Sequence, residues 1–419
     1  MPQRNRFSSC LLSWPAAFLT LGALVPAHAD LFSYVEKPDK AYKWELRSTE
    51  QLPQGKVYDL FLVSQVWQGI TWEHQLQVYE PARIEFPDLV GLLITGGSAG
   101  TNDRQIGLII ANMIGVRVAA IYHIPNQPLF NNLREDGLIS YTWMKYIETG
   151  DEDWVLLFPM VKAVIRAMDC LEDLAQQQWQ TKLRGFFVTG ASKRGWTTYL
   201  TAIYDPDRCV AIAPMVFDIL NIAVQAFHQK EFWGAYSEQI ADYTEKELEQ
   251  FAEEGRGFRL LWMVDPYSYR QRLTMPKLII LGSNDPYWPT DAVNYYWHGL
   301  SHPKGLLIAP NSGHGLDDHM RVLSSLCSFF QLVARKEQMP RAKWDFAESP
   351  EELCLTVTSD TPVVESRLWV AHSHVRDFRK SKWEEMPLVA KDDKLVGTVP
   401  RAEDQYTAAY GEVVYDIGG

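Results

Sequence analysis

Hydrophobic and polar residues alternate in two neighbouring stretches near the start of the chain. Residues 57–67 and 72–79 both place apolar side chains at every second position, which is the period of a strand with one buried face. Gln68 and Gly69 lie between them and are suited to a tight turn. The pattern therefore predicts a β-hairpin.

The pattern then changes to short, continuously apolar runs that alternate with segments of helical spacing. Such runs are typical of strands buried on both faces, as in a parallel sheet with helices on each side. Strands are predicted at 90–97, 116–123, 209–217, 277–282 and 305–310, and helices at 102–114 and 155–179. The order indicates a mostly parallel α/β sheet with helices on both faces, in which ligands bind at the carboxyl ends of the strands.

The segment between the strands at 209–217 and 277–282 is rich in aromatic and charged residues. Residues 218–232 and 244–254 have helical spacing, so we expect an insertion at about 218–274 that forms a helical cap over the cleft. The alternative interpretation is that most of its aromatic rings pack against the core.

The character of the chain changes again after a predicted helix at 318–336. Short β-like runs broken by Pro, Asp and Gly predict a small β-sandwich over residues 341–419, following the α/β domain over 30–340. These runs are 351–360, 363–373, 395–399 and 406–416. A module that stabilises the α/β domain is favoured over one that binds carbohydrate or peptide and over one that lies at the edge of the active-site mouth.

The first 29 residues resemble a secretory signal peptide. Arg4 and Arg6 precede an apolar segment at 11–25, and Ala27-His28-Ala29 offers small residues before a cleavage site at Asp30. The apolar segment is short and is interrupted by Ser13-Trp14-Pro15, so a retained membrane anchor is the less favoured interpretation. We expect a periplasmic or secreted protein with no integral membrane segment after processing.

Composition narrows the classes of partner. The chain has 419 residues, 47% of them hydrophobic, and a formal net charge of −12. These values indicate a packed globular protein and disfavour nucleic acid as a partner. Four cysteines follow the leader, all in apolar runs and without metal-ligand spacing, so we expect mostly buried thiols and neither a metal nor a cofactor. They are Cys170, Cys209, Cys327 and Cys354.

The strongest chemical signal lies at residues 183–200, where an apolar strand, a turn of small residues and a helix follow one another. This is the layout of a nucleophile elbow, with Ser192 as the candidate nucleophile after Gly190 and Ala191. One departure is the bulky Arg194 two residues after the serine, with Gly195 only at the next position. A serine near a helix N-terminus is the alternative interpretation.

Two further candidates follow predicted strands in the chain order of this fold. Asp285 comes shortly after the strand at 277–282, and His314 lies in a glycine-rich turn after the strand at 305–310. A serine hydroxyl needs a base, and the base needs an orienting carboxylate. We therefore predict that His314 takes the proton from Ser192 and that Asp285 orients the imidazole.

Other acids and a possible metal site are the alternatives to this triad. Asp291 and Asp265 are reserve acids, although neither directly follows a clear strand, and Asp265 is interpreted as structural. The cluster Asp317-Asp318-His319 lacks recognisable ligand spacing and is interpreted as a helix start.

An oxyanion hole requires two N–H donors. The backbone of Lys193 is expected to supply one, and the turn that contains Gly96 and Gly97 the other. The side chains of Lys193 and Arg194 leave two interpretations open. In the first, they face the cleft and attract an acyl oxygen or an acidic substrate group. In the second, they are solvated at the helix start or bind a core carboxylate.

Five motifs stand out along the chain. They are Gly-Ala-Ser-Lys-Arg-Gly-Trp-Thr-Thr at 190–198, Val264-Asp-Pro-Tyr-Ser-Tyr-Arg, Met275-Pro-Lys-Leu-Ile-Ile-Leu-Gly-Ser-Asn-Asp, Pro310-Asn-Ser-Gly-His-Gly and Arg376-Asp-Phe-Arg-Lys-Ser-Lys-Trp. Together they resemble the PhoPQ-activated pathogenicity-related protein family, from about residue 40 to the C-terminus. The resemblance implies an α/β-hydrolase fold and supports Ser192, Asp285 and His314 by position, but it defines no substrate. The elbow is also similar to the Gly-x-Ser-Arg-Asn-Gly elbow of glucuronoyl esterases, which implies oxyanion stabilisation by Lys193.

Two function classes follow. The first is an exported serine hydrolase that cleaves a small-molecule, peptide or glycan ester, or an amide, through an acyl-enzyme. The second is a non-catalytic binding or virulence-associated interaction protein that retains the fold, because a fold never proves activity.

Overall fold

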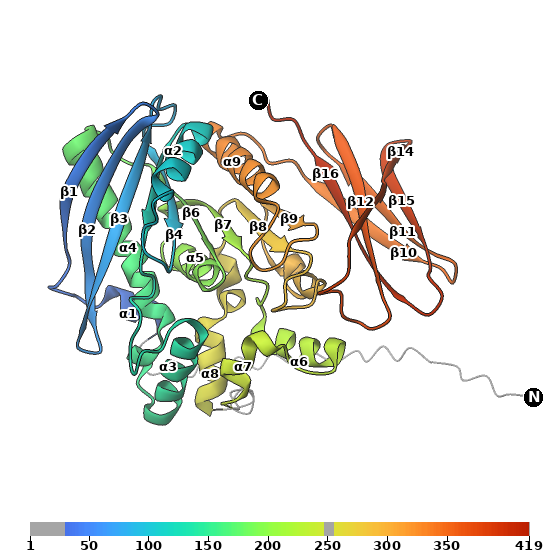
Figure 1. The fold of residues 1–419 in the computed structure, drawn as a ribbon, viewed down its shortest axis with the longest axis horizontal. Helices are drawn as coiled ribbons and strands as arrows, with labels where there is room; N and C mark the ends of the chain where they lie inside the picture. The colour runs from blue at the N-terminus through green and yellow to red at the C-terminus, as the bar shows by residue number, and fades with distance from the viewer. Residues whose placement is uncertain (1–29, 247–254, 419) are drawn as a thin grey trace, which may run out of the picture.

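A nine-stranded sheet forms the centre of the molecule in the computed structural model, which describes residues 30–246 and 255–418 (Figure 1). The first three strands pair antiparallel, and the six from β5 to β9 are parallel to one another. In sheet order they are β1 (Lys43–Leu52), β2 (Gly55–Trp67), β3 (Ile70–Pro81), β5 (Arg117–Ile121), β4 (Leu89–Ile94), β6 (Gly185–Ala191), β7 (Cys209–Met215), β8 (Lys277–Gly282) and β9 (Lys304–Ala309).

The predicted hairpin is confirmed as β2 and β3. Gln68 and Gly69 both have positive φ, 49° and 75°, as a two-residue hairpin turn of the type that matches strand twist requires. Strand β1 was not predicted from the sequence. It is an edge strand whose residues are exposed or half-buried, so it lacks the apolar signal of its neighbours.

Helices cover both faces of the sheet, as expected for the α/β-hydrolase fold, and the predicted fold class is confirmed. On one face α2 (Asp103–Ile114) and α9 (His319–Arg335) pack on the strands, and the ring of Phe330 stacks on Phe187 at 4.8 Å. On the other face lie α1 (Leu31–Glu36), α4 (Leu157–Leu174) and α5 (Lys193–Tyr204). These two layers of buried apolar contacts hold the parallel strands rigid, so the loops at their ends start from fixed points.

A helical cap lies beyond the ends of the parallel strands (Figure 1). Between β7 and β8 the chain forms α6 (Ile222–Trp233), α7 (Ala241–Thr244) and α8 (Gly255–Val264). The helix predicted at 244–254 falls largely outside the described residues. A further helix, α3 (Glu135–Thr149), packs against α7 and α8.

The C-terminal strands form two antiparallel sheets, as predicted. Their inner faces bury a small separate core that includes Leu355, Leu368 and Val399. One sheet holds β10 (Ala342–Glu348), β11 (Glu352–Ser359), β15 (Lys394–Pro400) and β14 (Val389–Lys391), and the other β13 (Glu384–Pro387), β12 (Glu365–Ser373) and β16 (Tyr406–Val414).

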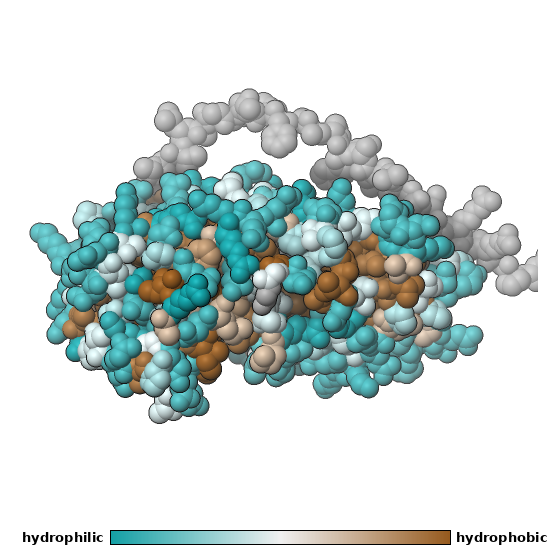
Figure 2. Space-filling model, turned by 90° about the horizontal axis from the view of Figure 1, so that it is seen from above, coloured by the Kyte–Doolittle hydropathy of each residue, from teal (hydrophilic) through white to brown (hydrophobic). Residues whose placement is uncertain are grey.

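The exterior is mainly hydrophilic on the face that Figure 2 shows, where hydrophobic residues gather in several separate groups. Within the described part of the chain, no helix is both long and apolar enough to cross a membrane. The four cysteines there are free thiols, three of them buried, as predicted. The predicted signal peptide at 1–29 lies outside the described residues.

Candidate functional site

The elbow has a strained backbone at Ser192. Strand β6 ends at Ala191 and α5 begins at Lys193, so the serine alone makes the turn with φ 58° and ψ −124°. Positive φ is costly for a residue with a side chain and persists where the surrounding structure enforces it. Two glycines permit the close packing around this turn: a Cβ at Gly190 would lie 2.7 Å from the Arg194 carbonyl oxygen, and one at Gly195 would lie 2.9 Å from that of Met215.

The two basic residues after Ser192 bind carboxylates on α3. The Arg194 guanidinium donates two hydrogen bonds of 2.7 Å to the Glu135 carboxylate and a third of 2.6 Å to the Ile124 carbonyl oxygen. Lys193 Nζ lies 2.8 Å from Asp136 Oδ2. Although burial acts to raise it, the Arg194 guanidinium holds the pKa of the Glu135 carboxyl at about 2. For Arg194 the structure supports the carboxylate partner, whereas Lys193 both binds a carboxylate and lines the cavity described below.

The loops after β8 and β9 bring Asp285 and His314 together. Asp285 Oδ2 lies 2.8 Å from His314 Nδ1, and Asp285 Oδ1 accepts a hydrogen bond of 2.9 Å from the Tyr287 backbone N–H. The Tyr287 ring lies against the imidazole with centroids 4.2 Å apart. The carboxylate is thus fixed by its own loop, and the imidazole is held on two sides.

Ser192 and His314 line one cavity of about 380 Å³, which lies between the sheet and the cap helices. His314 Nε2 is buried and has no hydrogen-bond partner within the described ranges, Ser192 included. The nitrogen opposite the Asp285 contact is therefore unengaged. A catalytic hydrogen bond that is long without substrate is common and tightens in the complex.

The turn that contains Gly96 and Gly97 does not line this cavity among the residues described. A Cβ at Gly96 would lie 1.7 Å from a guanidinium nitrogen of Arg194, so this glycine lets the arginine pass under the turn. A Cβ at Gly97 would meet nothing within 4 Å. The oxyanion role expected for this turn stays a prediction.

The C-terminal domain is hydrogen-bonded to the loops after β8 and β9, which carry Asp285 and His314. Asn284 Nδ2 donates to the carbonyl oxygens of Phe378, Arg379 and Ser381, at 3.1, 3.3 and 2.7 Å. Asn311 exchanges two hydrogen bonds with the Trp383 backbone, at 3.0 and 2.8 Å. One asparagine precedes Asp285 directly, and the other lies three residues before His314. The segment 376–383 thus fixes the backbone of both loops, a role that sequence reasoning missed.

The reserve acids have other partners. The Asp265 carboxylate accepts hydrogen bonds from the backbone N–H groups of Asn221, Ile222 and Tyr267, in keeping with its structural interpretation. Asp291 Oδ1 lies 2.8 Å from Nε2 of His228. Neither acid contacts His314.

The predicted helix start after His314 is confirmed. The Asp318 side chain caps α9 by accepting from the Arg321 N–H, and Asp317 Oδ2 accepts from Gly313 N–H at 3.0 Å. Within the described residues, no group of three or more His, Cys, Asp or Glu is arranged to hold a metal ion.

A buried acid after β7 was also missed. Asp218 Oδ1 accepts a hydrogen bond of 2.6 Å from the Tyr296 hydroxyl. Burial first, and then the carboxylates of Asp285 and Asp291, raise the pKa of Asp218 to about 8. Its position three residues past the end of a strand was the available signal.

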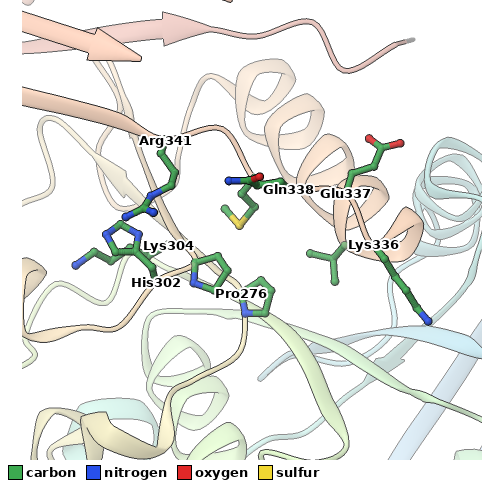
Figure 3. A pocket seen from close by; sticks show the side chains of 10 residues that line it. Pro276, His302, Lys304, Lys336, Glu337, Gln338 and Arg341 are labelled. Carbon is green, nitrogen blue, oxygen red and sulfur yellow. The ribbon is translucent and has the colours of Figure 1, made fainter. Parts of the chain in front are cut away.

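A second cavity, of about 300 Å³, lies at the amino ends of β8 and β9 (Figure 3). Its labelled side chains include Arg341, which points toward His302 and Lys304. Lys304 Nζ is already held by the carbonyl oxygens of Trp297 and Leu300. This cavity has no hydroxyl or thiol among its described lining residues, so it offers no counterpart to Ser192.

Comparisons with known proteins find a matching family model and a curated relative. The family model described as "PhoPQ-activated pathogenicity-related protein" matches residues 31–379. A curated relative, "Autocrine proliferation repressor protein A" of Dictyostelium discoideum, is 31% identical over 377 residues, which cover 83% of this chain and 76% of the relative.

Among solved structures, acetyl xylan esterase 1 from Thermoanaerobacterium sp. JW/SL YS485 is 17% identical, with a TM-score of 0.47, and the match covers 68% of this chain and 88% of that one. Acetyl xylan esterase from Paenibacillus sp. R4 is 14% identical, with a TM-score of 0.48 and coverage of 70% and 92%. At these identities the likeness concerns the fold alone.

Proposed function

Because the chain belongs to the PhoPQ-activated pathogenicity-related protein family, whose description names no reaction, we propose a function from the geometry: a serine hydrolase that cleaves an ester or amide. The observation that carries the proposal is the His314–Asp285 contact of 2.8 Å, with Nε2 left unengaged in the cavity that Ser192 also lines. A base oriented on one nitrogen and unengaged on the other is what a serine nucleophile requires.

In the proposed reaction, Ser192 Oγ attacks the substrate carbonyl carbon while its proton moves to His314 Nε2. The tetrahedral intermediate collapses, and the leaving alkoxide or amine takes that proton from the imidazolium. The acyl-enzyme is then attacked by water, which gives its proton to Nε2, and the second intermediate releases the acid and returns the proton to Ser192. The sum is ester or amide plus water giving acid plus alcohol or amine.

The oxyanion of each intermediate needs N–H donors. We assign one to the Lys193 backbone, since the first amide of a helix has no partner within that helix. Gly96 and Gly97 remain our candidates for the second donor. The Lys193 ammonium is paired with Asp136, so electrostatic help from that side chain would be reduced by a neighbouring negative charge.

We also propose that the protein is exported to the periplasm or beyond. The proposal rests on the basic and apolar segments within residues 1–29 and the small residues before Asp30. Comparing the mass of the N-terminus of protein from a periplasmic extract with the full sequence tests it, and an intact Met1 there would contradict it.

Labelling by a fluorophosphonate probe tests the hydrolase proposal directly. We expect the native protein to be labelled on Ser192 and the Ser192→Ala variant to be unlabelled, because the probe phosphonylates only an activated hydroxyl. Ser324→Ala on α9 is a matched control, exposed and outside the cavity, and should label like the native protein. Failure of the native protein to label would contradict the proposal.

The second candidate is a non-catalytic interaction protein that keeps the fold. It is favoured by the name of the curated relative, which refers to repression of proliferation and not to a reaction. It predicts that Ser192→Ala retains whatever biological effect the native protein has. The hydrolase proposal predicts that this effect is lost together with labelling.

A further inference from the structure

The cavity that contains Ser192 and His314 extends away from them between apolar side chains. Its walls come from α3, α5, α6, α8 and the segment after β7. Large apolar side chains dominate these walls, among them Trp143, Trp196, Phe217, Ile222, Leu260 and Leu261. Five of the six are at least 90% buried, so they form a wall of the cavity and not an outer surface.

Most polar groups along these walls are already paired with one another. Asp136 binds Lys193 Nζ at 2.8 Å and accepts a hydrogen bond of 2.8 Å from the Tyr243 hydroxyl. The Trp196 indole N–H donates to the Val264 carbonyl oxygen at 2.5 Å. The Trp143 indole N–H is a buried donor without a partner in the part of the chain described.

This pairing has a consequence for the kind of substrate that fits. Sugars and peptides present many hydroxyl or amide groups, and each would have to exchange water for a hydrogen bond inside the cavity. The paired groups Asp136, Lys193 and Tyr243 offer little for that exchange. An apolar chain requires no such exchange and gains free energy by leaving water.

The size of the cavity points the same way. A water molecule occupies about 30 Å³ of liquid volume, so 380 Å³ has room for roughly a dozen groups of that size. An acetyl group would fill a small part of it, whereas a chain of about eight carbons would occupy most of it.

We infer that the cavity binds an apolar acyl chain of about eight carbons, so that the preferred substrates are medium-chain esters. The inference rests on the proposed function, because it takes Ser192 as the group that receives the acyl chain. It goes beyond that function by naming the acid part of the ester: an apolar acyl chain is favoured over a sugar or a peptide in the cavity.

A series of p-nitrophenyl esters tests the inference. We expect kcat/KM to rise at least about tenfold from acetate to octanoate, because a single methylene group in a hydrophobic pocket can already be worth about tenfold. An equal or higher value for acetate would overturn the inference and leave the hydrolase proposal standing.

Filling the cavity provides a second test with a matched control. Ala226 on α6 lines the cavity, so Ala226→Phe should lower the ratio of octanoate to acetate kcat/KM at least about tenfold. Val224 lies on the same helix, is 39% exposed and does not line the cavity, so Val224→Phe should leave the ratio unchanged. Equal ratios in the two variants would count against the inference.

A binding measurement separates failure of the inference from failure of the proposed function. Isothermal titration of Ser192→Ala with octanoate and with acetate reports on the cavity without any reaction. If no ester is hydrolysed and the native protein is unlabelled, the proposed function fails, but tighter binding of octanoate would still support an apolar-chain site. No preference for octanoate in that titration would overturn the site as well.

Discussion

Two histidine–aspartate pairs involve acids of the segment after β8, and only one of the pairs leaves a ring nitrogen without a hydrogen-bond partner in the described residues. His314 and Asp285 are joined through Nδ1 at 2.8 Å, and His228 and Asp291 are joined through Nε2 at 2.8 Å. Both acids follow β8. The contact lengths are the same, so distance alone does not tell the two pairs apart.

The difference lies in the second ring nitrogen. Nδ1 of His228 lies 3.0 Å from the Tyr295 hydroxyl, so both of its nitrogens are engaged. Nε2 of His314 is buried without a partner in the described chain and lies beside the cavity that contains Ser192. A neutral imidazole accepts a proton only on an unprotonated nitrogen that can reach the donor. The comparison identifies His228 as a structural group between α6 and the loop after β8.

Replacing each histidine in turn should give the largest difference. We expect His314→Ala to lower kcat by about a thousandfold or more, because the serine loses its base. His228→Ala should leave kcat within about threefold and lower the free energy of unfolding by roughly 1–3 kcal/mol, because Asp291 and Tyr295 lose a buried partner. Steady-state kinetics and urea unfolding measure both effects. Similar losses of kcat in the two variants would break the comparison.

Loosening the loop that carries Asp285 should have a smaller effect. Asn284→Ala removes the contacts to the three carbonyl oxygens of the C-terminal domain, so we expect kcat to fall by about tenfold with little change in KM, because the reacting groups are less well positioned. Asn112 is a matched control, since its side chain also bonds two backbone carbonyls, those of Gln54 and Leu108, far from the cavity. Asn112→Ala should lower the stability without lowering kcat. Unchanged kcat in Asn284→Ala would separate the C-terminal domain from catalysis.

The smallest effect concerns Asp218, whose carboxyl is influenced by both acids of the comparison. Its pKa of about 8 lies above the usual 3.8, so the folded protein keeps a proton that the unfolded chain releases. The free energy of unfolding should therefore fall as the pH rises from about 4 to 8. Asp218→Asn removes this dependence. The free energy of unfolding of the variant, taken relative to that of the native protein, should therefore increase by on the order of 1–3 kcal/mol from pH 5 to pH 8. Parallel stability curves for the two proteins would show that Asp218 is ionised when folded.

Much of the sheet and the order of the candidate residues could be predicted from the sequence, because each signal is local. A strand followed by Gly190-Ala191-Ser192, or by the glycine-rich turn around His314, is recognisable within a dozen residues. The partners of Lys193 and Arg194 could not be predicted in this way. Glu135 lies 59 residues before Arg194 in the chain. Helix α3 also begins at Glu135 without a side-chain cap to mark its start.

The same reason explains why the role of segment 376–383 was missed. Asn284 meets the Ser381 carbonyl oxygen across 97 residues, and no periodic pattern encodes a contact between an asparagine and a distant backbone. The residues of this segment were visible as a family motif, but a motif identifies which residues matter and not what they touch. The difference between His314 and His228 was hidden too, since it depends on Tyr295, 67 residues after His228.

Because the Arg194 guanidinium passes beneath Gly96 to reach Glu135, the residues at these three distant positions depend on one another. Any side chain at position 96 would collide with the guanidinium, and displacing the guanidinium would cost Glu135 both of its hydrogen bonds from Arg194. A substitution at one of these positions is tolerable only with compensating changes at the other two. Across related sequences we therefore expect positions 96, 135 and 194 to be exchanged as a set or retained as a set.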